Sequence, residues 1–494
     1  LERSTTPFCH KVKESSTPTH LSDEHKNRKI VDLAGQMEYG KSYSAYKAAP
    51  SEICKETAGV SVQLLHPKAK TPIPRAKLTE MFGQTPAERE CFSPFTGDEV
   101  CRVIKTSKRR SSAGFSGLSY DHIRESLARN PEIADMLASI FSFMVDKQWC
   151  PPCLNKSRLI AIKKKGRNKK DTRAYRPIAI SESPKRLLSR LLAKRMEKYC
   201  KGVLDPQQAA VGVSDGAGQH LLVTNYILEH MDEDAVAMGV DMRNAYNELP
   251  REACLQAARS AGIPEAIVGY LENSMRDATL DYEGRNITHS TGVAQGDPSS
   301  TILFCLGINP MLNAARKVCP KGPKIHGSHA PPQQSFADDA LHITPNQAVA
   351  QEVATSLAEV ADTLHMVMLP AKMFVISKSP CNIIIKGVEV PQYPRCQTDP
   401  ETQIDPPVAL GTKPYLGVPI GDRERSAQQT QDKVLAIAKD IEEIWASDLH
   451  RQTAYTLTRH CLLPRATYLI RHAAGIEPCL PEFDRRVRAA IETV

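Results

Sequence analysis

The chain has 494 residues, of which 41% are hydrophobic and 24% charged, an ordinary balance for a globular protein of two or three domains. No apolar run approaches the roughly 20 residues that a membrane-spanning helix needs, so no membrane partner is expected. The formal net charge is +8, and the excess is localised, because ten basic residues and only one acidic residue lie between Lys156 and Arg176. Such a run is most often a solvated face and by itself is weak evidence for a polyanionic partner.

The 14 cysteines show no framework spacing, so reduced intracellular thiols are the default expectation. Cys150 and Cys153 form a lone CxxC pair, and both a redox and a zinc interpretation are weak because no second pair stands nearby. The tail of a zinc finger beginning before residue 1 is weakly indicated by Cys9, His10, His20 and His25.

The first predicted elements follow a polar N-terminal segment. Residues 1–75 are rich in Ser, Thr, Pro and Lys, show no sustained period, and end in an extended linker at 66–75. Hydrophobic periodicity then predicts, in order, a helix at 99–109, a small-residue loop at 111–118, a helical region at 119–149, a strand at 158–166 and a basic helix at 185–200.

The second half of the chain continues to alternate strands and helices. The predicted elements are a buried strand at 235–242, helices at 251–262 and 264–278, a hairpin at 335–343, a helix at 348–365, a strand at 373–377 and an almost wholly helical region after 421. This pattern predicts an α+β fold, with a sheet of few strands, helices packed on one side of it and helical appendages.

Acidic residues end or interrupt two of the predicted strands. Asp241 follows the apolar strand, and Asp338 and Asp339 lie at the tip of the hairpin in QSFADDALHI. A carboxylate in such a place needs a partner, and adjacent strands could bring the two sites together. Without His or Cys nearby, the set suits Mg²⁺, which serves phosphoryl chemistry in pairs roughly 3.5–4 Å apart. The alternative is that these are ordinary strand-end or turn aspartates, and the doublet alone does not decide between them.

Two other segments carry groups that suit a nucleotide. GVAQGDPSS at 292–300 is a turn leading into an apolar helix; its backbone N–H groups and Gln295 could line a pocket, and Gly296 permits close approach. The basic segment IKKKG…DTRAYRPI supplies a lysine point charge and arginine forks, which are the groups that bind triphosphates.

The order of these segments resembles the successive motifs of reverse transcriptases of non-LTR retrotransposons, over roughly residues 95–475. The motifs are IKKKG…YRPIAI, DMRNAY, AQGDPSS, FADD, LPAKMFVIS and YLGVPIG. The upstream loop SSAGFSGL is similar to the extra N-terminal motif of this group. Several loop variants are nearer to site-specific elements such as those of trypanosomatid spliced-leader genes.

The resemblance implies catalytic roles for the acidic residues. Asp241, Asp338 and Asp339 match the carboxylate triad, in which the first two would hold two Mg²⁺ ions, with Mn²⁺ as a substitute, and Asp339 is the less critical third acid. Tyr246 matches the aromatic steric gate, whose ring excludes a 2′-OH and so selects dNTPs.

The resemblance also implies nucleotide-binding roles. Lys164 and Arg176 match the residues that would grip the triphosphate. Gln295 and Gly296 match the loop that would contact the nucleotide and the template. Lys372 matches a lysine that would protonate the leaving pyrophosphate or balance its charge. YLGVPIG matches the primer-gripping hairpin. One departure is His365, where glycine is common; another is Met373 directly after Lys372, where threonine is common.

The implied architecture is a right-hand polymerase with fingers, a palm containing a small antiparallel sheet, and a helical thumb. The expected divisions are 1–75 as the polar segment and linker with a zinc-finger remnant, 76–205 as N-terminal extension and fingers, 206–425 as palm with some fingers elements, and 426–494 as a truncated thumb. The implied partners are an RNA template, a DNA primer or nicked target DNA, and dNTPs. The implied location is nuclear, after assembly with RNA in the cytoplasm. An endonuclease domain is expected outside this chain, which begins with Leu1 and so suggests a fragment or a processed product.

Three other functions remain open from the sequence. A viral RNA-dependent RNA polymerase shares the acidic motifs, but Tyr246 disfavours ribonucleotides. A group II intron-type maturase has similar motifs, whereas the upstream loop and YLGVPIG favour the retrotransposon group. The third is a catalytically inactive copy that serves as an RNA-binding scaffold. Inactive copies typically lose an acidic residue, and all three are present here, so inactivity is not indicated.

Overall fold

The computed structural model of the chain describes residues 23–35, 42–43, 46, 55–109, 111–164, 168, 170–171, 174–393 and 412–492. Two compact units are present, one made of residues 1–51, 432–470 and 477–494, the other of residues 52–431 and 471–476. Of the residues that weakly indicated a zinc finger, Cys9, His10 and His20 lie outside the described residues, as does the side chain of His25.

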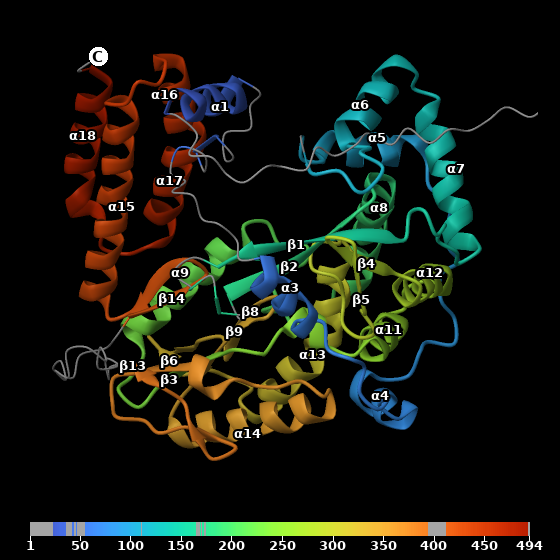
Figure 1. The fold of residues 1–494 in the computed structure, drawn as a ribbon. Coiled ribbons are helices and arrows are strands. Elements are labelled where there is room, and N and C mark those ends of the chain that lie inside the picture. The colour runs from blue at the N-terminus through green and yellow to red at the C-terminus, as the bar shows by residue number, and fades with distance from the viewer. Residues whose placement is uncertain are drawn as a thin grey trace, which may run out of the picture. The chain divides into compact units, whose positions relative to one another are not determined.

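The regular secondary structure described in the smaller unit is entirely helical. Its helices are α1 (Asp23–Gly35), α15 (Arg423–Trp445) from Asp432 onward, α16 (Arg451–Leu457), η3 (Thr458–Leu462), α17 (Leu463–His472) to Ile470, η4 (Glu477–Cys479) and α18 (Leu480–Glu492). Val434, Ala438 and Ile441 are buried along one face of α15, as the period of an amphipathic helix requires. Arg486 forms an ion pair with Glu442, with Nε 2.6 Å from Oε1, which joins α18 to α15. The predicted helical C-terminal region is therefore confirmed (Figure 1).

The larger unit contains a five-stranded sheet. Its strands in spatial order are β13 (Gln392–Tyr393), β10 (Phe374–Ser377), β3 (Val236–Val240), β9 (Asp339–Thr344) and β8 (Gln333–Phe336). All neighbouring pairs are antiparallel except β10–β13, which is parallel. The central strand β3 is buried on both sides, in agreement with its continuous apolar sequence.

A second sheet has four strands. In spatial order they are β2 (Tyr175–Ser181), β1 (Lys156–Lys163), β4 (Thr279–Tyr282) and β5 (Arg285–Ile287). The helix α3 (Lys55–Leu64) packs on this sheet, where Ala58 and Val62 share an apolar cluster with Leu159 and Leu280. Neither α3 nor the β4–β5 hairpin was predicted. The sequence of α3 does not segregate apolar and polar residues clearly, and the stability of this short helix comes from docking.

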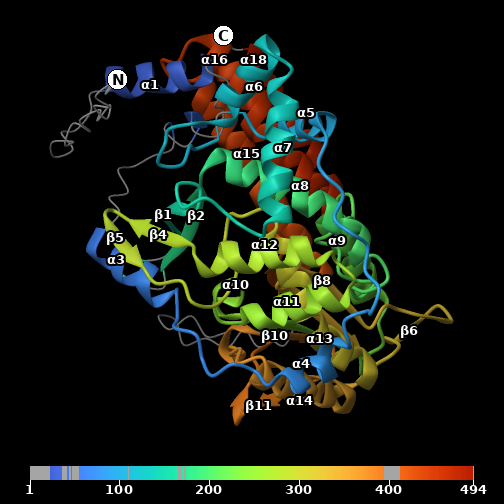
Figure 2. The same ribbon diagram turned by 90° about the vertical axis from the view of Figure 1, so that its right-hand side faces the viewer.

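Helices surround the two sheets. α13 (Ser300–Val318) is almost entirely buried and packs on α11 (Arg251–Ser260) and α14 (Gln347–Thr363), and α14 also contacts β3 and β9. The other helices are α4 (Arg75–Phe82), α5 (Gly97–Thr106), α6 (Tyr120–Arg129), α7 (Ile133–Asp146), α8 (Ser183–Cys200), α9 (Gly216–His230), α10 (Ala245–Glu248), α12 (Glu265–Arg276) and η2 (Pro370–Lys372). The mixed class of helices with small sheets is thus confirmed (Figure 2).

Three short hairpins complete the larger unit. They are formed by β6 (Lys324–Ile325) with β7 (Ser328–His329), β11 (Ile384–Ile385) with β12 (Val388–Glu389), and β14 (Thr412–Tyr415) with β15 (Val418–Gly421). The last one contains the predicted YLGVPIG hairpin.

The helical region predicted at 119–149 is divided in two. α6 ends at Arg129 and α7 begins at Ile133, because Pro131 interrupts the backbone hydrogen bonds and disfavours helical geometry at Asn130. Ser119 caps α6 and receives the backbone N–H of His122, so the start of this region follows the predicted loop.

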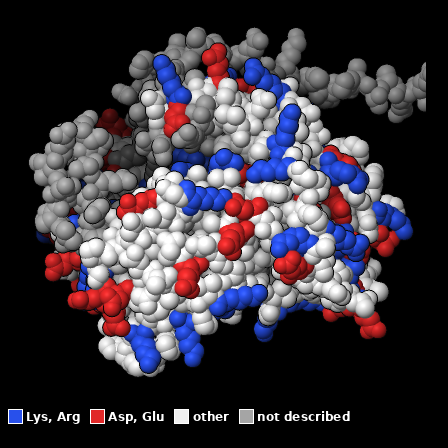
Figure 3. Space-filling model, turned by 90° about the horizontal axis from the view of Figure 1, so that it is seen from below, with Lys and Arg blue, Asp and Glu red and all other residues white. Residues whose placement is uncertain are grey.

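Charge and hydropathy at the surface agree with the composition. No helix in the described part of the chain is long and apolar enough to cross a membrane. On the face seen in Figure 3, basic and acidic side chains are interspersed, so this face carries no extended patch of one sign.

Candidate active site

The register of the five-stranded sheet brings the predicted acidic residues together. β3 and β9 are antiparallel neighbours in which Val240 pairs with Ala340, so Asp241, the next residue, lies opposite Asp339. Residues directly opposite in such a pair have Cα atoms about 4.5–5.5 Å apart. Asp338 occupies the two-residue turn between Phe336 and Asp339. The predicted hairpin with aspartates at its tip, next to the strand that ends in Asp241, is confirmed.

The hairpin turn is held by a side chain that the sequence did not indicate. Ala337 has a φ of 56°, in the left-handed region, and its N–H donates to Oε1 of the buried Gln208 at 2.9 Å. The Gln208 amide in turn donates to Oγ of Ser335 at 2.9 Å. Gln208 therefore fixes the conformation that presents Asp338. No local signal marks this residue, because its partners lie more than a hundred residues away in the chain.

The carboxylates perturb one another electrostatically. Asp338 and Asp339 are accessible at the turn, unlike the buried strand suggested by the flanking sequence, yet the surrounding protein shields their carboxylates from bulk water. This desolvation, followed by the charges of Asp338 and Asp241, raises the pKa of Asp339 to about 6. Desolvation also raises the pKa values of Asp241 and Asp338. A bound cation would relieve this accumulation of negative charge.

Basic residues from several elements act on these carboxylates. Lys372, Lys413 and Lys164 each favour the charged form of Asp241 and so oppose the rise of its pKa. Arg176, which is exposed on β2 and pairs with Ile162 of β1, does the same for Asp338 and Asp339. Lys164 directly follows β1, and its N–H donates to the carbonyl of Ala174 at 2.6 Å. The predicted triphosphate-binding residues therefore lie within electrostatic reach of the acidic ones.

A cavity of about 110 Å³ adjoins the acidic residues. It is lined by Asp241 and Asp339, by the predicted Lys372, and by two residues that were not predicted, Lys413 and Tyr415 of the β14–β15 hairpin. The Tyr415 hydroxyl is buried and has no hydrogen-bond partner among the described residues. Burial, and to a smaller extent Asp339, raises the pKa of Tyr415. The sequence marked this hairpin as a motif but not these two side chains.

The backbone ties the Lys372 segment to Asp241. The N–H of Leu369 donates to the carbonyl of Asp241 at 3.0 Å, and the N–H of Arg243 donates to that of Val367 at 2.9 Å. Met373, which stands directly after Lys372 at the position where the resemblance implies threonine, is buried, so the core accommodates its larger side chain.

Tyr246 lies on α10, just after Asp241, and packs against the core. Its ring stacks on that of Phe304, with centroids 4.2 Å apart and planes 7° from parallel. Its carbonyl accepts the N–H of Val293 at 2.8 Å. Burial is the main cause of the raised pKa of its phenol, so the hydroxyl stays protonated.

The loop with Gln295 and Gly296 is fitted closely between its neighbours. The carbonyl of Gln295 accepts the N–H of Ala179 on β2 at 2.9 Å. Gly296 has a φ of 110°, and a Cβ there would lie 2.6 Å from the carbonyl oxygen of Ala179, so only glycine fits. Asp297 holds the start of α13, because its Oδ1 accepts the N–H and hydroxyl of Ser299 at 2.9 and 2.6 Å.

Upstream of Gly296, Gly292 locks this loop to the Tyr246 segment. Gly292 has a φ of 74°, and a Cβ there would lie 2.4 Å from the carbonyl carbon and oxygen of Asn247. Asn247, which follows Tyr246, is buried, and its Nδ2 donates to the carbonyl of Leu65 at 2.6 Å. The Tyr246 segment is therefore clamped from two sides.

Leu65 belongs to a stretch that we call the N-terminal strap, residues 65–73, which leads from α3 towards α4 (Figures 1 and 2). Within it, the N–H of Ala69 donates to Oγ of Ser290 at 2.9 Å, and the carbonyl of Thr71 lies 3.1 Å from Nε2 of His365. His365 has a φ of 55°, the left-handed conformation that glycine favours. The strap thus bonds to α10, which carries Tyr246, and to two loops, one before Gln295 and one before Lys372.

The lone CxxC pair has no site around it. Cys150 is buried, Cys153 is exposed, and both are free thiols. Burial is the main cause of the raised pKa of Cys150, which disfavours the reactive thiolate.

Comparison with known proteins places this geometry in a family. A model of the reverse transcriptase (RNA-dependent DNA polymerase) family matches residues 162–418, more than half of the chain. The chain therefore belongs to the reverse transcriptase family. The resemblance to the non-LTR retrotransposon type is confirmed as well, because its curated relatives come from such elements.

Three of these relatives show the extent of the similarity. The chain is 26% identical over 335 residues to the "Retrovirus-related Pol polyprotein from type-1 retrotransposable element R2" of Popillia japonica, covering 64% of this chain and 44% of the relative. The protein of the same name from Nasonia vitripennis is 23% identical over 322 residues, covering 63% and 30%. The "RNA-directed DNA polymerase from mobile element jockey" of Drosophila melanogaster is 22% identical over 268 residues, covering 47% and 29%. The chain thus spans less than half the length of each.

Reverse transcriptases use divalent metal ions, and the acidic residues fit such ions. In the described part of the chain, no group of three or more His, Cys, Asp or Glu side chains is placed to hold a metal. Asp241, Asp338 and Asp339 instead offer carboxylates that interact over a short range. That arrangement suits Mg²⁺, which is usually bound by one or two carboxylates together with substrate phosphates rather than by an all-protein cage.

Proposed function

We propose that this chain is the RNA-directed DNA polymerase of a non-LTR retrotransposon, which adds dNTPs to a primer 3′-OH on an RNA template. One observation carries the proposal: the sheet register sets Asp241 opposite Asp339 and beside Asp338, with lysine and arginine side chains acting on all three. A cluster of carboxylates and cations of this kind suits the transfer of a nucleotidyl group from a triphosphate.

The elements support a right-hand arrangement. We assign the four-stranded sheet with α5 to α8 to the fingers and N-terminal extension, residues 76–205, together with the β4–β5 hairpin. The five-stranded sheet with α13 and α14 forms the palm, residues 206–425, and α15 to α18 form the thumb from residue 426.

Asp241 and Asp338 would hold two Mg²⁺ ions, or Mn²⁺ in their place, with Asp339 in support. Such ions make a bound hydroxyl a better nucleophile at neutral pH and stabilise negative charge on the phosphates. The raised pKa values of the three acids support this assignment, because they report a site short of positive charge.

The side chains around the acids divide the remaining tasks. Lys164 and Arg176 bind the triphosphate, and the loop at Gln295 and Gly296 positions the base and the template strand. The ring of Tyr246, held parallel to Phe304, occupies the space of a 2′-OH and so favours dNTPs. Lys372 balances charge at the leaving pyrophosphate and gives it a proton.

The partners follow from this chemistry. The template is RNA, and the primer is DNA, including the 3′ end of a nicked target. An endonuclease domain outside this chain would produce the nick. The protein would act in the nucleus, after assembling with its RNA in the cytoplasm.

Primer extension on poly(rA)/oligo(dT) with Mg²⁺ tests the proposal. We expect the wild-type chain to incorporate dTTP, and Asp338→Ala to abolish incorporation while retaining its affinity for the primer–template. Asp146→Ala is a matched control, since Asp146 is an exposed aspartate that pairs only with its neighbour Lys147. Equal incorporation by wild type and Asp338→Ala would show that these carboxylates are not catalytic.

A further inference from the structure

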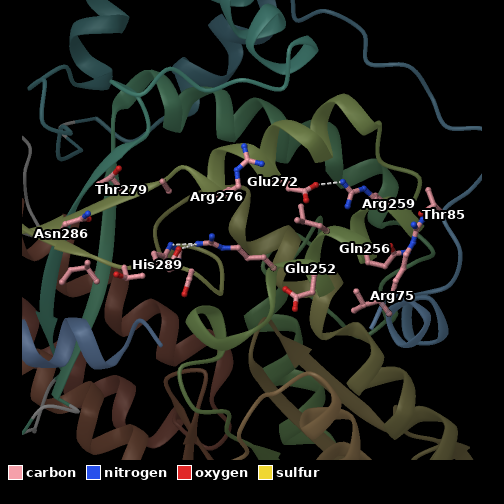
Figure 4. A pocket seen from close by; sticks show the side chains of 17 residues that line it. Arg75, Thr85, Glu252, Gln256, Arg259, Glu272, Arg276, Thr279, Asn286 and His289 are labelled. Carbon is pink, nitrogen blue, oxygen red and sulfur yellow. Dashed lines mark hydrogen bonds and ion pairs between the residues drawn. The ribbon is translucent and has the colours of Figure 1, made fainter. Parts of the chain in front are cut away.

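A second and larger hollow lies away from the carboxylates. It is a groove of about 880 Å³ between α4, α11, α12 and the β4–β5 hairpin with the residues that follow it. Figure 4 shows polar side chains along its whole length, from Asn286 and Thr279 at one end to Arg75 and Gln256 at the other. None of its lining residues also lines the cavity at Asp241.

The groove carries a net positive charge. Four arginines line it, namely Arg75, Arg251, Arg259 and Arg276, against the two acids Glu252 and Glu272. Arg259 is neutralised, because its Nη2 lies 2.9 Å from Glu265 and 2.6 Å from Glu272. Within the described part of the chain, the exposed Arg276 forms an ion pair only with the adjacent Asp277, and the exposed Arg75 forms none.

Arg251 supplies a half-buried charge next to these exposed arginines. Its guanidinium donates to the carbonyls of Gly292 and Met275, each at 2.9 Å, and to that of His289 at 2.6 Å. No described carboxylate forms an ion pair with it. Burial lowers its pKa to about 10, so it remains a cation at neutral pH. A half-buried cation whose hydrogen-bond acceptors are all neutral, and on which only the adjacent Glu252 acts as a carboxylate, can accept a further anion nearby.

The uncharged residues of the lining indicate which kind of anion the groove binds. Hydroxyl and amide groups dominate it, including Gln256, Thr279, Asn286, Thr288 and Ser290. Peptides generally dock through aromatic or aliphatic anchors, but the large aliphatic residues of this lining, Leu78, Leu255 and Ile287, are buried in the core. Arginine forks with hydroxyl and amide groups are instead the usual partners of sugar–phosphate backbones. The volume also falls in the range of ligand sites, about 300–1,000 Å³.

We propose that this groove binds the phosphates of a single-stranded polynucleotide, with Arg75 and Arg276 as direct contacts and Arg251 as the charge next to them. The site is separate from the proposed polymerase site and would hold a strand that is not being copied at that moment. Its ligand is recognised through phosphates rather than base edges, so binding depends strongly on salt and little on sequence.

The double variant Arg75→Ala/Arg276→Ala tests the proposal. The probe is a fluorescent oligo(rA), or oligo(dA) of equal length, and its affinity is measured over a KCl series with the polymerase site filled by unlabelled primer–template. We expect about a tenfold loss of affinity at low salt, at about threefold for each phosphate contact, and a salt slope shallower by about 1.4. Arg251 is left intact because it also holds the carbonyl of Gly292.

Arg129→Ala/Arg485→Ala is the matched control. It removes the same charge from two exposed helical arginines, each paired within its own helix. Affinity loss beyond this control for both strands supports phosphate recognition of either polynucleotide, and loss for RNA alone shows that ribose is also read. If the groove variant binds both strands as the control does, the proposal is wrong. If the groove variant extends a short primer–template as well as wild type does, the variant is folded. The same measurement tests the polymerase assignment independently, so failure of one proposal can be told apart from failure of the other.

Discussion

Gly292 offers the sharpest test of how the loop before Gln295 is held against the Tyr246 segment. Substituting alanine would first place a side chain at a φ of 74°, which costs roughly 1–2 kcal/mol for an L-residue in the left-handed region. It would also put Cβ 2.4 Å from the Asn247 carbonyl, which is backbone and cannot rotate away. Overpacking of this kind costs about 1–3 kcal/mol, so the total is about 2–5 kcal/mol.

The loop is the part that can give way. We expect it to move from Asn247 and to lose the hydrogen bond from Val293 to Tyr246, because Asn247 itself is buried and is held by hydrogen bonds to the carbonyls of Leu65 and Asn244. Folding should survive, since domains have about 5–15 kcal/mol of stability, but the KM for dNTPs should rise. Urea unfolding and steady-state primer extension measure the two effects.

Gly262→Ala is the control for this substitution. Gly262 has a φ of 83°, but a Cβ there would meet nothing within 4 Å. It should therefore show only the conformational cost of about 1–2 kcal/mol and an unchanged KM. If Gly292→Ala and Gly262→Ala lose the same stability and leave the KM alike, close packing on Asn247 does not position the nucleotide loop.

Three further predictions concern single side chains of the proposed active site. Tyr246→Ala should raise the ratio of rNTP to dNTP incorporation, measured as the ratio of kcat/KM values; an unchanged ratio would contradict its role as a gate. Asp339 has a pKa of about 6 in the folded state, above the roughly 3.9 of an aspartate in the unfolded state. Between these two pH values the folded protein therefore binds more protons than the unfolded protein, and its stability falls as the pH rises from about 3.9 to about 6. In EDTA, Asp339→Asn should therefore be more stable than wild type at pH 7.5, with the difference shrinking towards pH 4, and a constant difference would contradict this linkage. Tyr415→Phe should gain about 1 kcal/mol in urea unfolding, because it removes a buried hydroxyl without a partner, and should extend primers more slowly if that hydroxyl serves the substrate; a loss of stability would mean that the hydroxyl is bonded.

The acidic residues could be predicted from the sequence because each carries a local signal. Asp241 ends a continuous apolar strand, and Asp338 and Asp339 interrupt a hairpin, so a shared sheet is enough to bring them together. The resemblance then supplied the order of the motifs. Periodicity indicates where the strands lie in the sequence, and the structure shows that β3 and β9 are neighbours.

The supporting residues could not be predicted because their partners are distant in the chain. Gln208 and Asn247 are ordinary polar residues by local pattern, and their importance comes from hydrogen bonds formed only in three dimensions. Tyr415 is equally unmarked, and only the fold shows that its buried hydroxyl lies at the cavity beside Asp339. The β4–β5 hairpin was missed although Glu283 and Gly284 form a turn signal, because its strands are only four and three residues long. The strap was interpreted as a linker since it has no period, and only its hydrogen bonds reveal its place.

The sequence separation between the strap and its partners also determines when the strap can dock during synthesis. Leu65 and its partner Asn247 are 182 residues apart. At roughly 5–20 residues per second, a ribosome needs about 10–40 s to synthesise the partner after the strap itself. During that time, the residues to which the strap finally bonds have not yet been synthesised. The strap therefore leaves the ribosome before every proposed active-site residue, yet it can form these hydrogen bonds only after its partners have been made.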